Sequence, residues 1–377
     1  MGKNLKGREL GKGITQRKDG RYQARYTNRF GKRQTVYSKN LSEIRNILKE
    51  EQKKDSYNMS VREELTLDEW FTIWLDTCKS NCRDSTKQCY RVRYNRIKEE
   101  LGWRKLTSLN LILLQRVFND LGSDKSRKDT KITLVDMLNK AVDSELLSKN
   151  IAKQINTVVS PTKKEEQRVL TKKETDLFLK YAKGTFYYNL YVLALETGMR
   201  VGELLGLQWS DINFDKKYLL VSHTMVYYSK NGKYVHELHD PKTKNGIRKI
   251  PLTQKAMKAL TAQRIQKNEI CLQGKIADEK FENLVFVTKN NKPAQHFLIQ
   301  QSIELILAKM DGFKYFTTHT FRHTFATRAI ENGMQPKTLQ KILGHGTLAM
   351  TMDLYCHTTD DILFSEMEKM ESKVCKN

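Results

Sequence analysis

The order of apolar and polar residues near the start of the chain predicts a small sheet. Over residues 21–26, tyrosine and alanine alternate with arginine and glutamine, which is the period of a strand with one apolar and one basic face. Turn-forming residues flank this segment, and residues 35–37 follow as a returning strand. Leucine and isoleucine then recur at helical spacing over residues 41–48. Residues 1–56 are therefore expected to form a three-stranded β-sheet covered by one helix.

Apolar residues at helical spacing continue through the next hundred residues. Arg91 and Arg93 fall on the solvent side of the second of these segments, where Tyr94 and Ile97 share the apolar face. Residues 63–159 are thus expected to form an all-helical domain with basic faces and polar linkers on either side. Its four predicted helices cover residues 65–74, 85–97, 106–121 and 128–144.

The rest of the chain contains segments with strand alternation and segments with helical spacing of apolar residues. Thr171 and Glu174 have the spacing of a capping box, which opens the third domain. Residues 168–377 are expected to form a mixed, mostly helical domain with a small antiparallel sheet. The whole chain is thus predicted to be a multidomain α/β protein. The elements expected in this domain are an apolar helix at 187–196, strands at 218–228 and 248–252, and helices to the end, the last an amphipathic helix at 360–373.

Charge and composition narrow the class of partner. The 377 residues carry a formal net charge of +24, and the first 60 hold 16 lysines and arginines against 6 acidic residues. Such an excess indicates a polyanionic partner, of which nucleic acid is the first candidate. No long apolar run and no secretory signal is present, so we expect a cytoplasmic protein without membrane contact. The six cysteines have no metal-ligand spacing, and neither a disulfide nor a metal site is expected.

Side chains suited to phosphate chemistry concentrate between residues 318 and 355. At about 100° per residue, His319 and Arg322 fall within one polar arc of a helix, with two phenylalanines opposite. His345 follows a glycine that suits a helix cap, and Tyr355 comes one short segment later. Arginine, imidazole and a tyrosine hydroxyl presented together suit phosphoryl transfer without a metal.

These residues carry a specific resemblance. The pattern His319-x-x-Arg322, Leu343-Gly344-His345 and then Tyr355 resembles the C-terminal box of the tyrosine recombinases, also called the phage-integrase family. Residues 197–204 (TGMRVGEL) resemble the arginine box of that family, and residues 241–252 (PKTKNGIRKIPL) resemble its lysine-bearing β-hairpin. The basic sheet at the start is similar to the arm-binding domain of certain integrases, and the helical domain to their core-binding domain.

The resemblance implies a role for each matching residue. The arginines would grip the scissile phosphate, Tyr355 would attack it to form a 3′-phosphotyrosyl bond, and Lys242 or its neighbour Lys244 would protonate the leaving 5′-hydroxyl. His319 would move the tyrosine proton and His345 would hydrogen-bond the phosphate, while His323 is treated as structural or secondary. No cofactor is implied. The implied catalytic residues are Arg200, Lys242, His319, Arg322, His345 and Tyr355, with Glu203 in support.

The resemblance also implies partners. The expected function is integration and excision of a mobile element, as in integrases of conjugative transposons and temperate phages of low-GC bacteria. Double-stranded DNA would bind at core and arm sites, and a homo-tetramer would form on DNA through the helix at 360–373. An excision factor and a host DNA-bending protein would assist, and the DNA-bound enzyme would lie at the bacterial nucleoid. Four arginines are expected to contact DNA: Arg21, Arg25, Arg91 and Arg93.

Three other functions fit parts of the pattern. A chromosome-dimer-resolving recombinase has the same chemistry, but typically lacks an arm domain such as residues 1–56. A type IB topoisomerase would relax supercoils as a monomer without a preferred site. A non-catalytic DNA-binding regulator would keep the basic surfaces without using the catalytic set. All would bind DNA in a salt-sensitive manner, so binding alone does not separate them.

Overall fold

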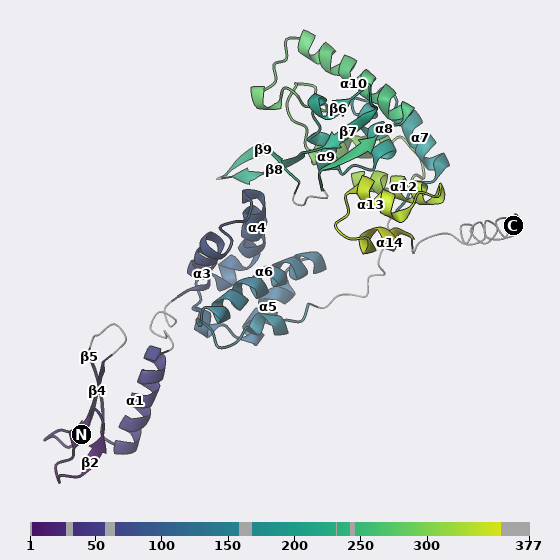
Figure 1. Ribbon diagram of the computed structural model, residues 1–377. Coiled ribbons are helices and arrows are strands. Elements are labelled where there is room, and N and C mark those ends of the chain that lie inside the picture. The colour runs from purple at the N-terminus through teal and green to yellow at the C-terminus, as the bar shows by residue number, and fades with distance from the viewer. Residues whose placement is uncertain are drawn as a thin grey trace, which may run out of the picture. The chain divides into compact units, whose positions relative to one another are not determined.

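The computed structural model of the protein describes residues 2–27, 33–56, 65–157, 168–230, 232–241 and 246–355. The chain separates into two compact units, residues 1–162 and 163–377, and each is described by itself (Figure 1). The first unit contains two separate hydrophobic cores, one in the basic sheet and one in the helical segment. The predicted domain limits at 56, 63, 159 and 168 fall in or beside segments outside the described residues, and they stay predictions.

The basic N-terminal segment is a sheet backed by a helix, as the alternation predicted. Strands pair antiparallel in the order β3-β4-β5, and Ala24 faces the core with Ile14 and Ile44. The side chain of Asn40 accepts the backbone N–H of Ser42 and so begins the helix. A short β1–β2 ladder was not predicted. The elements are β1 (Gly2–Lys3), β2 (Glu9–Gly11), β3 (Ile14–Gln16), β4 (Tyr22–Thr27), β5 (Arg33–Ser38) and α1 (Leu41–Ser56).

The following segment is helical, with two corrections to the predicted bounds. The helix expected from residue 106 begins at Leu111, because the Asn110 side chain accepts the backbone N–H of Leu113 at 2.9 Å and caps it there. The helix expected from residue 128 begins at Asp124, behind Ser123 as its cap. The elements are α3 (Leu67–Ile73), the π-helix η1 (Trp74–Cys78), α4 (Asp84–Leu101), η2 (Leu106–Ser108), α5 (Leu111–Asp120), α6 (Asp124–Asp143) and η3 (Ile151–Gln154).

The second unit is mostly helical and begins with the predicted capping box, in which Thr171 and Glu174 cap each other's backbone. Its helices are α7 (Lys172–Ala182), α8 (Tyr188–Thr197), α9 (Val201–Leu205), η4 (Trp209–Asp211), α10 (Gln254–Leu272), η6 (Glu279–Phe281), α11 (His296–Leu307), α12 (Thr318–Glu331), α13 (Pro336–Leu343) and α14 (Ala349–Tyr355). Its strands are β6 (Ile212–Asn213), β7 (Tyr218–Val221), β8 (Thr224–Lys230), β9 (Lys233–His239) and β10 (Arg248–Pro251).

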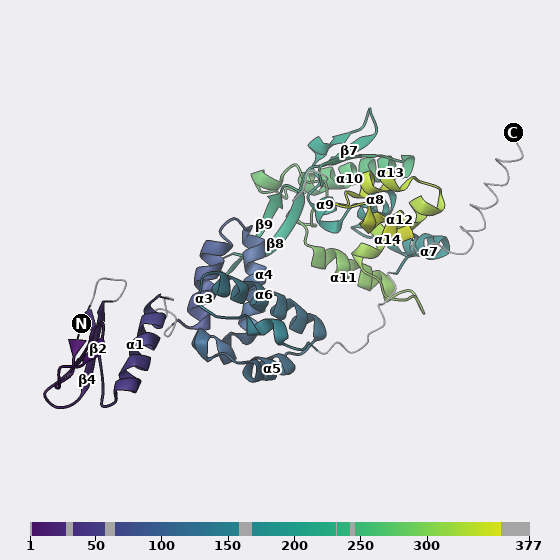
Figure 2. The ribbon, with the colours of Figure 1, turned by 60° about the horizontal axis from the view of Figure 1, so that its bottom comes forward.

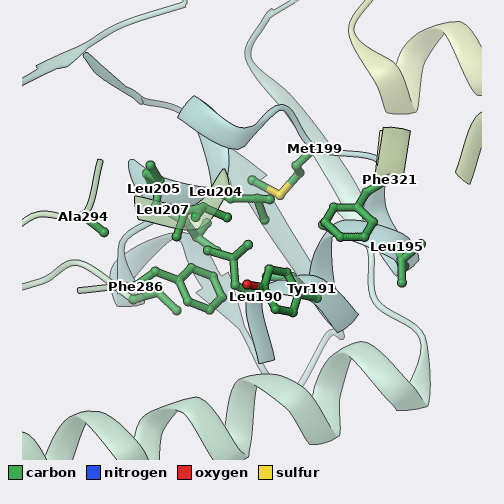
Figure 3. Close-up of a cluster of buried hydrophobic side chains, with 14 of the residues drawn as sticks. Leu190, Tyr191, Leu195, Met199, Leu204, Leu205, Leu207, Phe286, Ala294 and Phe321 are labelled. Carbon is green, nitrogen blue, oxygen red and sulfur yellow. The ribbon is translucent and has the colours of Figure 1, made fainter. Parts of the chain in front are cut away.

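Helix α8 lies at the centre of this unit and packs against α7, α9, α10 and α12. It is apolar around most of its circumference, as a helix buried on several sides must be. Leu190 and Tyr191 are almost fully buried, and the ring of Phe321 on α12 lies 5.6 Å from that of Tyr191 (Figure 3). This packing brings the end of α8, where the arginine box starts, next to α12, where the histidine–arginine motif lies.

The strands of the second unit form two small antiparallel sheets, where a single small antiparallel sheet was predicted. β10 pairs with β7 and β7 with β6, while β8 and β9 form a separate antiparallel ribbon (Figure 2). Lys242, which was predicted on a β-hairpin, follows β9 and precedes β10 in the sequence and lies outside the described residues. The strand predicted at 218–228 is divided between β7 and β8, and β9 was not predicted. No helix of the described residues is long and apolar enough to cross a membrane.

Candidate active site

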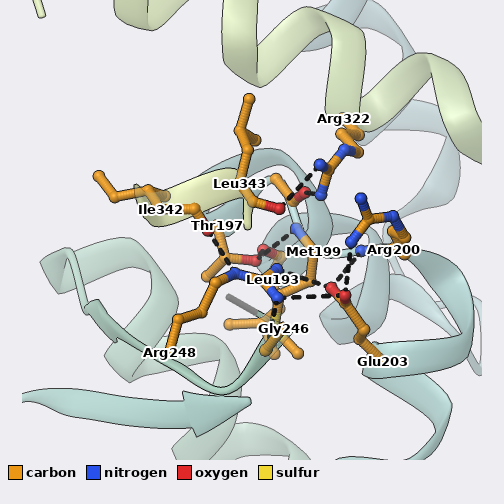
Figure 4. Close-up of polar contacts among 11 residues, drawn as sticks. Leu193, Thr197, Met199, Arg200, Glu203, Gly246, Arg248, Arg322, Ile342 and Leu343 are labelled. Atoms are coloured by element: carbon orange, nitrogen blue, oxygen red, sulfur yellow. Dashed lines mark hydrogen bonds and ion pairs between the residues drawn. The ribbon is translucent and has the colours of Figure 1, made fainter. Parts of the chain in front are cut away.

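Arg322 is held by the carbonyl ends of two other helices. Its Nη1 donates to the Gly198 carbonyl at 2.9 Å and its Nη2 to the Leu343 carbonyl at 2.8 Å (Figure 4). These carbonyls belong to the C-terminal ends of α8 and α13, where backbone oxygens lack helical partners and the helix dipole favours a cation. Only 4% of Arg322 is exposed, and its other three N–H groups have no partner among the described residues.

Gly198 is the residue that allows α8 to end this close to α12. It caps α8 in the left-handed conformation, with φ of 63°. A Cβ at this position would lie 2.4 Å from the Phe325 side chain. A larger residue would therefore both strain the backbone and displace α12, which carries Arg322.

Arg200 begins the short helix α9 and is paired with Glu203 one turn later. Its Nη1 donates to Glu203 Oε1 at 2.8 Å, and its backbone N–H to Glu203 Oε2 at 2.9 Å. The Arg200 side chain is 40% exposed, while that of Glu203 is 6% exposed. Arg200 thus reaches the surface beside the buried Arg322 (Figure 4). Burial together with the charge of Arg200 lowers the pKa of Arg322 to about 9, so a bound anion would stabilise its protonated form.

Three histidines lie near these arginines: His345 is buried, His323 is half-buried and His319 is exposed. Their surroundings favour the neutral imidazole in each case. The rings of His319 and His323 meet edge to face at 4.6 Å between centroids. Burial, then the charges of Arg322 and Arg200, lower the pKa of His345 to about 4. The pKa of His323 is also lowered to about 4, by burial and then by His319 and Arg322. The pKa of His319 is lowered by partial burial and by the charges of Arg322 and Arg200.

Acidification is expected to destabilise the unit formed by residues 163–377. Between pH 6.5 and 4 the unfolded chain would bind protons at His323 and His345 that the folded chain does not bind. The free energy of unfolding should therefore fall as the pH drops through this window, by up to about 1.4 kcal/mol per pH unit for each histidine. Thermal melts from pH 7.5 to 5 would measure this. His345→Asn should reduce the slope, and a melting temperature independent of pH in the native chain would contradict the prediction.

His345 links the arginine cluster to helix α14. It follows the Gly344 cap of α13, and its Nδ1 lies 2.9 Å from Oγ1 of Thr351, which is fully buried. Thr351 precedes position 355 on α14 by one helical turn. The backbone of Tyr355 is thus at the end of a helix anchored to this site, while its side chain lies outside the described residues. Thr351 was not found from the sequence, which offered no signal for it.

Arg248 is the second residue that the sequence reasoning missed. It is 7% exposed and makes a buried ion pair with Glu203, at 2.7 Å from its Nη2 to Oε2. One signal was available: Arg248 alternates with Ile250 and Leu252 on a predicted strand, which places it on the inward face.

The structure does not place every predicted residue in this site. Lys242 and Lys244 lie outside the described residues, as does the helix predicted at 360–373. Of the arginines predicted to contact DNA, Arg25 is exposed on β4 and Arg91 on α4. Arg21 is exposed beside Asp19, and Arg93 lies 3.6 Å from Asp129. Arg200, Glu203, His319, Arg322 and His345 are brought together.

Three family models match this chain. The phage integrase family matches residues 162–361, the DNA-binding domain of Tn916 integrase matches residues 2–66, and the N-terminal SAM-like domain of phage integrases matches residues 66–122. Because the first model covers more than half of the chain, the chain belongs to the phage integrase family of tyrosine recombinases. The resemblance inferred from the sequence motifs is confirmed.

Curated relatives agree with this family over most of the chain. The tyrosine recombinase XerC-like protein of Caldanaerobacter subterraneus subsp. tengcongensis is 31% identical over 332 residues, covering 81% of this chain and 85% of the relative. The transposase from transposon Tn916 of Enterococcus faecalis is 25% identical over 399 residues, covering 98% of this chain and 96% of the relative.

The fold of this chain is similar to that of solved integrase structures. A Tn1549 transposon integrase in complex with transposon right end DNA has 25% identity and a TM-score of 0.66, covering 81% of this chain and 100% of that one. A lambda integrase dimer bound to a COC′ core site has 19% identity and a TM-score of 0.57, covering 92% and 95% of the two chains. The second supports the fold alone.

Proposed function

We propose that this chain is a site-specific DNA recombinase that integrates and excises a mobile genetic element through a 3′-phosphotyrosyl intermediate. The observation that carries the proposal is the arginine pair. Arg322 is buried and has N–H donors without a partner in the described part of the chain, and it lies beside the more exposed Arg200. His345 connects both to the helix α14 (Ala349–Tyr355). A pair of guanidinium groups suits the non-bridging oxygens of a phosphodiester, which gain charge in the transition state.

In the proposed reaction, the Tyr355 hydroxyl oxygen attacks the scissile phosphorus and gives up its proton to His319. A bond forms between that oxygen and phosphorus, and the bond from phosphorus to the 5′-oxygen breaks. Lys242, or its neighbour Lys244, protonates the departing 5′-oxygen. The 5′-hydroxyl of a second duplex then attacks the phosphotyrosyl bond, which releases Tyr355 and joins the strands. One phosphodiester is replaced by another, so the exchange needs no energy source.

The neutral state of His345 suits a hydrogen bond to the phosphate. If the Thr351 hydroxyl donates to Nδ1, the ring proton lies on Nε2 and can be donated to a non-bridging oxygen. The lowered pKa keeps this tautomer uncharged at neutral pH, so the positive charge at the phosphate comes from the two arginines.

The proposed partners are double-stranded DNA and further copies of the chain. The DNA complex of the Tn1549 integrase supports binding of an element end by the helical and catalytic segments. The match of residues 2–66 to the DNA-binding domain of Tn916 integrase supports an arm site, where exposed Arg25 on β4 would face the duplex.

We propose that a tetramer forms on DNA through residues 360–373, assisted by an excision factor and a host DNA-bending protein. The mass of the synaptic complex, compared with that of a chain ending at 359, tests the tetramer.

Chromosome-dimer resolution is the second candidate function, and the 31% identity to a XerC-like recombinase favours it. The role of the N-terminal segment distinguishes the two candidates. Deleting residues 1–56 is expected to abolish integration while leaving cleavage of an isolated core site within about 3-fold of the full chain, because the arm contacts add binding energy remote from the chemistry. A cell-based integration assay and core-site cleavage measure the two effects. Full integration by the truncated chain would contradict an arm-dependent integrase.

Covalent trapping tests the reaction itself. The full chain is incubated with a nicked duplex carrying the end of the element, and a denaturant-resistant protein–DNA adduct is expected. Adding a second duplex with a free 5′-hydroxyl should yield a recombinant strand. Relaxation of supercoiled DNA without strand transfer would indicate a topoisomerase. Tight binding to a verified site with no adduct would indicate a regulator.

A further inference from the structure

Arg248 connects three segments of the second unit from a buried position. Its Nη1 and Nη2 donate to the two carboxylate oxygens of Glu203 at 3.1 and 2.7 Å (Figure 4). Its Nε donates to the Ile342 carbonyl at 2.5 Å, and Nη1 also donates to the Gly246 carbonyl at 3.2 Å. The Arg248 side chain is 5% exposed, so it cannot itself hold a DNA phosphate at the surface.

The carboxylate of Glu203 is shared between two guanidinium groups. Arg248 takes both oxygens from one side, and Arg200 donates to Oε1 at 2.8 Å from the other. With Arg322 nearby, this group of four charged side chains has a net charge of +2. Removal of Arg248 would lower that charge to +1 and leave Arg200 as the only cation bound to Glu203 among the described residues.

We propose that Arg248 is a positioning residue that neutralises Glu203, so that the charge of Arg200 remains available to the scissile phosphate. The inference rests on the proposed function of Arg200. Glu203 then orients the Arg200 guanidinium group by a hydrogen bond. It does not cancel the positive charge of Arg200, because the guanidinium group of Arg248 neutralises the same carboxylate. The bonds to the Ile342 and Gly246 carbonyls hold Arg248 in the one orientation that presents both Nη groups to Glu203.

A purely structural role for Arg248 predicts equal losses of cleavage on charged and neutral substrates. The proposed electrostatic role predicts a larger loss on the charged substrate. The full chain is tested in single-turnover cleavage of a nicked element-end duplex, with either the natural phosphate or a neutral methylphosphonate at the scissile position. Arg248→Met is expected to slow cleavage of the phosphate by ~100-fold, the scale of one lost electrostatic contact. The methylphosphonate is neutral, so its cleavage depends less on positive charge in the site. On this substrate Arg248→Met should slow cleavage by less than ~10-fold. Arg264→Met, an exposed arginine on α10, is the matched control and should cleave both substrates like the native chain.

The double variant Glu203→Gln with Arg248→Met removes one charge of each sign and restores the net charge of +2. It also leaves no uncompensated buried carboxylate, so it should fold even if the single variant does not. We expect it to cleave the phosphate ~10-fold or more faster than Arg248→Met. Equal losses on both substrates, or a folded double variant no faster than the single one, would overturn the role of Arg248. Unchanged cleavage by Arg200→Ala would instead contradict the proposed function on which the inference rests.

Discussion

Replacing Tyr355 by phenylalanine is expected to abolish the covalent adduct and to lower strand cleavage by at least ~10⁴-fold, the scale seen when a nucleophile is removed. The substitution deletes only the hydroxyl oxygen that would bond to phosphorus. Helix α14 should keep its anchor, because the contact between Thr351 and His345 does not involve position 355. DNA binding should therefore stay within about 3-fold of the native chain, since the phosphate contacts that dominate affinity are untouched.

The measurement combines a denaturing gel of a labelled, nicked element-end duplex with a native gel shift at fixed salt. Tyr181→Phe, a half-exposed tyrosine on α7, serves as the matched control and should form the adduct normally. An adduct formed by Tyr355→Phe would show that another side chain is the nucleophile. Loss of both the adduct and DNA binding would point to a folding defect, which a melting curve would reveal.

Replacing Arg322 by alanine is expected to lower cleavage by ~10²–10³-fold, because a preorganised donor to the developing phosphate charge is lost. The same change should also destabilise the protein. The Gly198 and Leu343 carbonyls would each lose a charged donor, and such hydrogen bonds contribute ~1.5–3 kcal/mol each. Relief of the repulsion between Arg322 and Arg200 offsets part of this loss, so we expect a net fall of ~2 kcal/mol in the free energy of unfolding.

Melting and cleavage measured on the same samples separate these two effects. A fall of ~2 kcal/mol corresponds to roughly 4–8 °C in melting temperature for a unit of this size. Cleavage should therefore be assayed well below the melting temperature, where both chains are folded. Arg322→Lys keeps the charge but cannot reach two carbonyls and a phosphate at once, and its cleavage rate should lie between the other two. A folded Arg322→Ala chain that cleaves at the native rate would exclude Arg322 from the reaction.

The sequence alone determined the features that depend on neighbouring residues. Strand alternation over 21–26 predicted the N-terminal sheet, and Thr171 with Glu174 predicted the start of α7, because both patterns involve contacts within a few residues. The family was also evident, since its boxes are contiguous runs such as residues 197–204. Where local signals competed, the sequence misplaced an element: apolar residues from 106 onward suggested one helix, but Asn110 caps a shorter one.

The partners of the buried arginines were decided only by the tertiary structure. Arg322 and Gly198 are separated by 124 residues, and Arg248 and Glu203 by 45. An arginine in a basic chain is usually solvated, so its sequence context does not reveal a buried carboxylate or a helix end as its partner. Alternation could put Arg248 on the inward face of β10, but the packing of β10, α9 and α13 decided what it meets there. The family motifs can thus be identified from the sequence alone, whereas the balance of charges around their arginines arises from packing between distant segments.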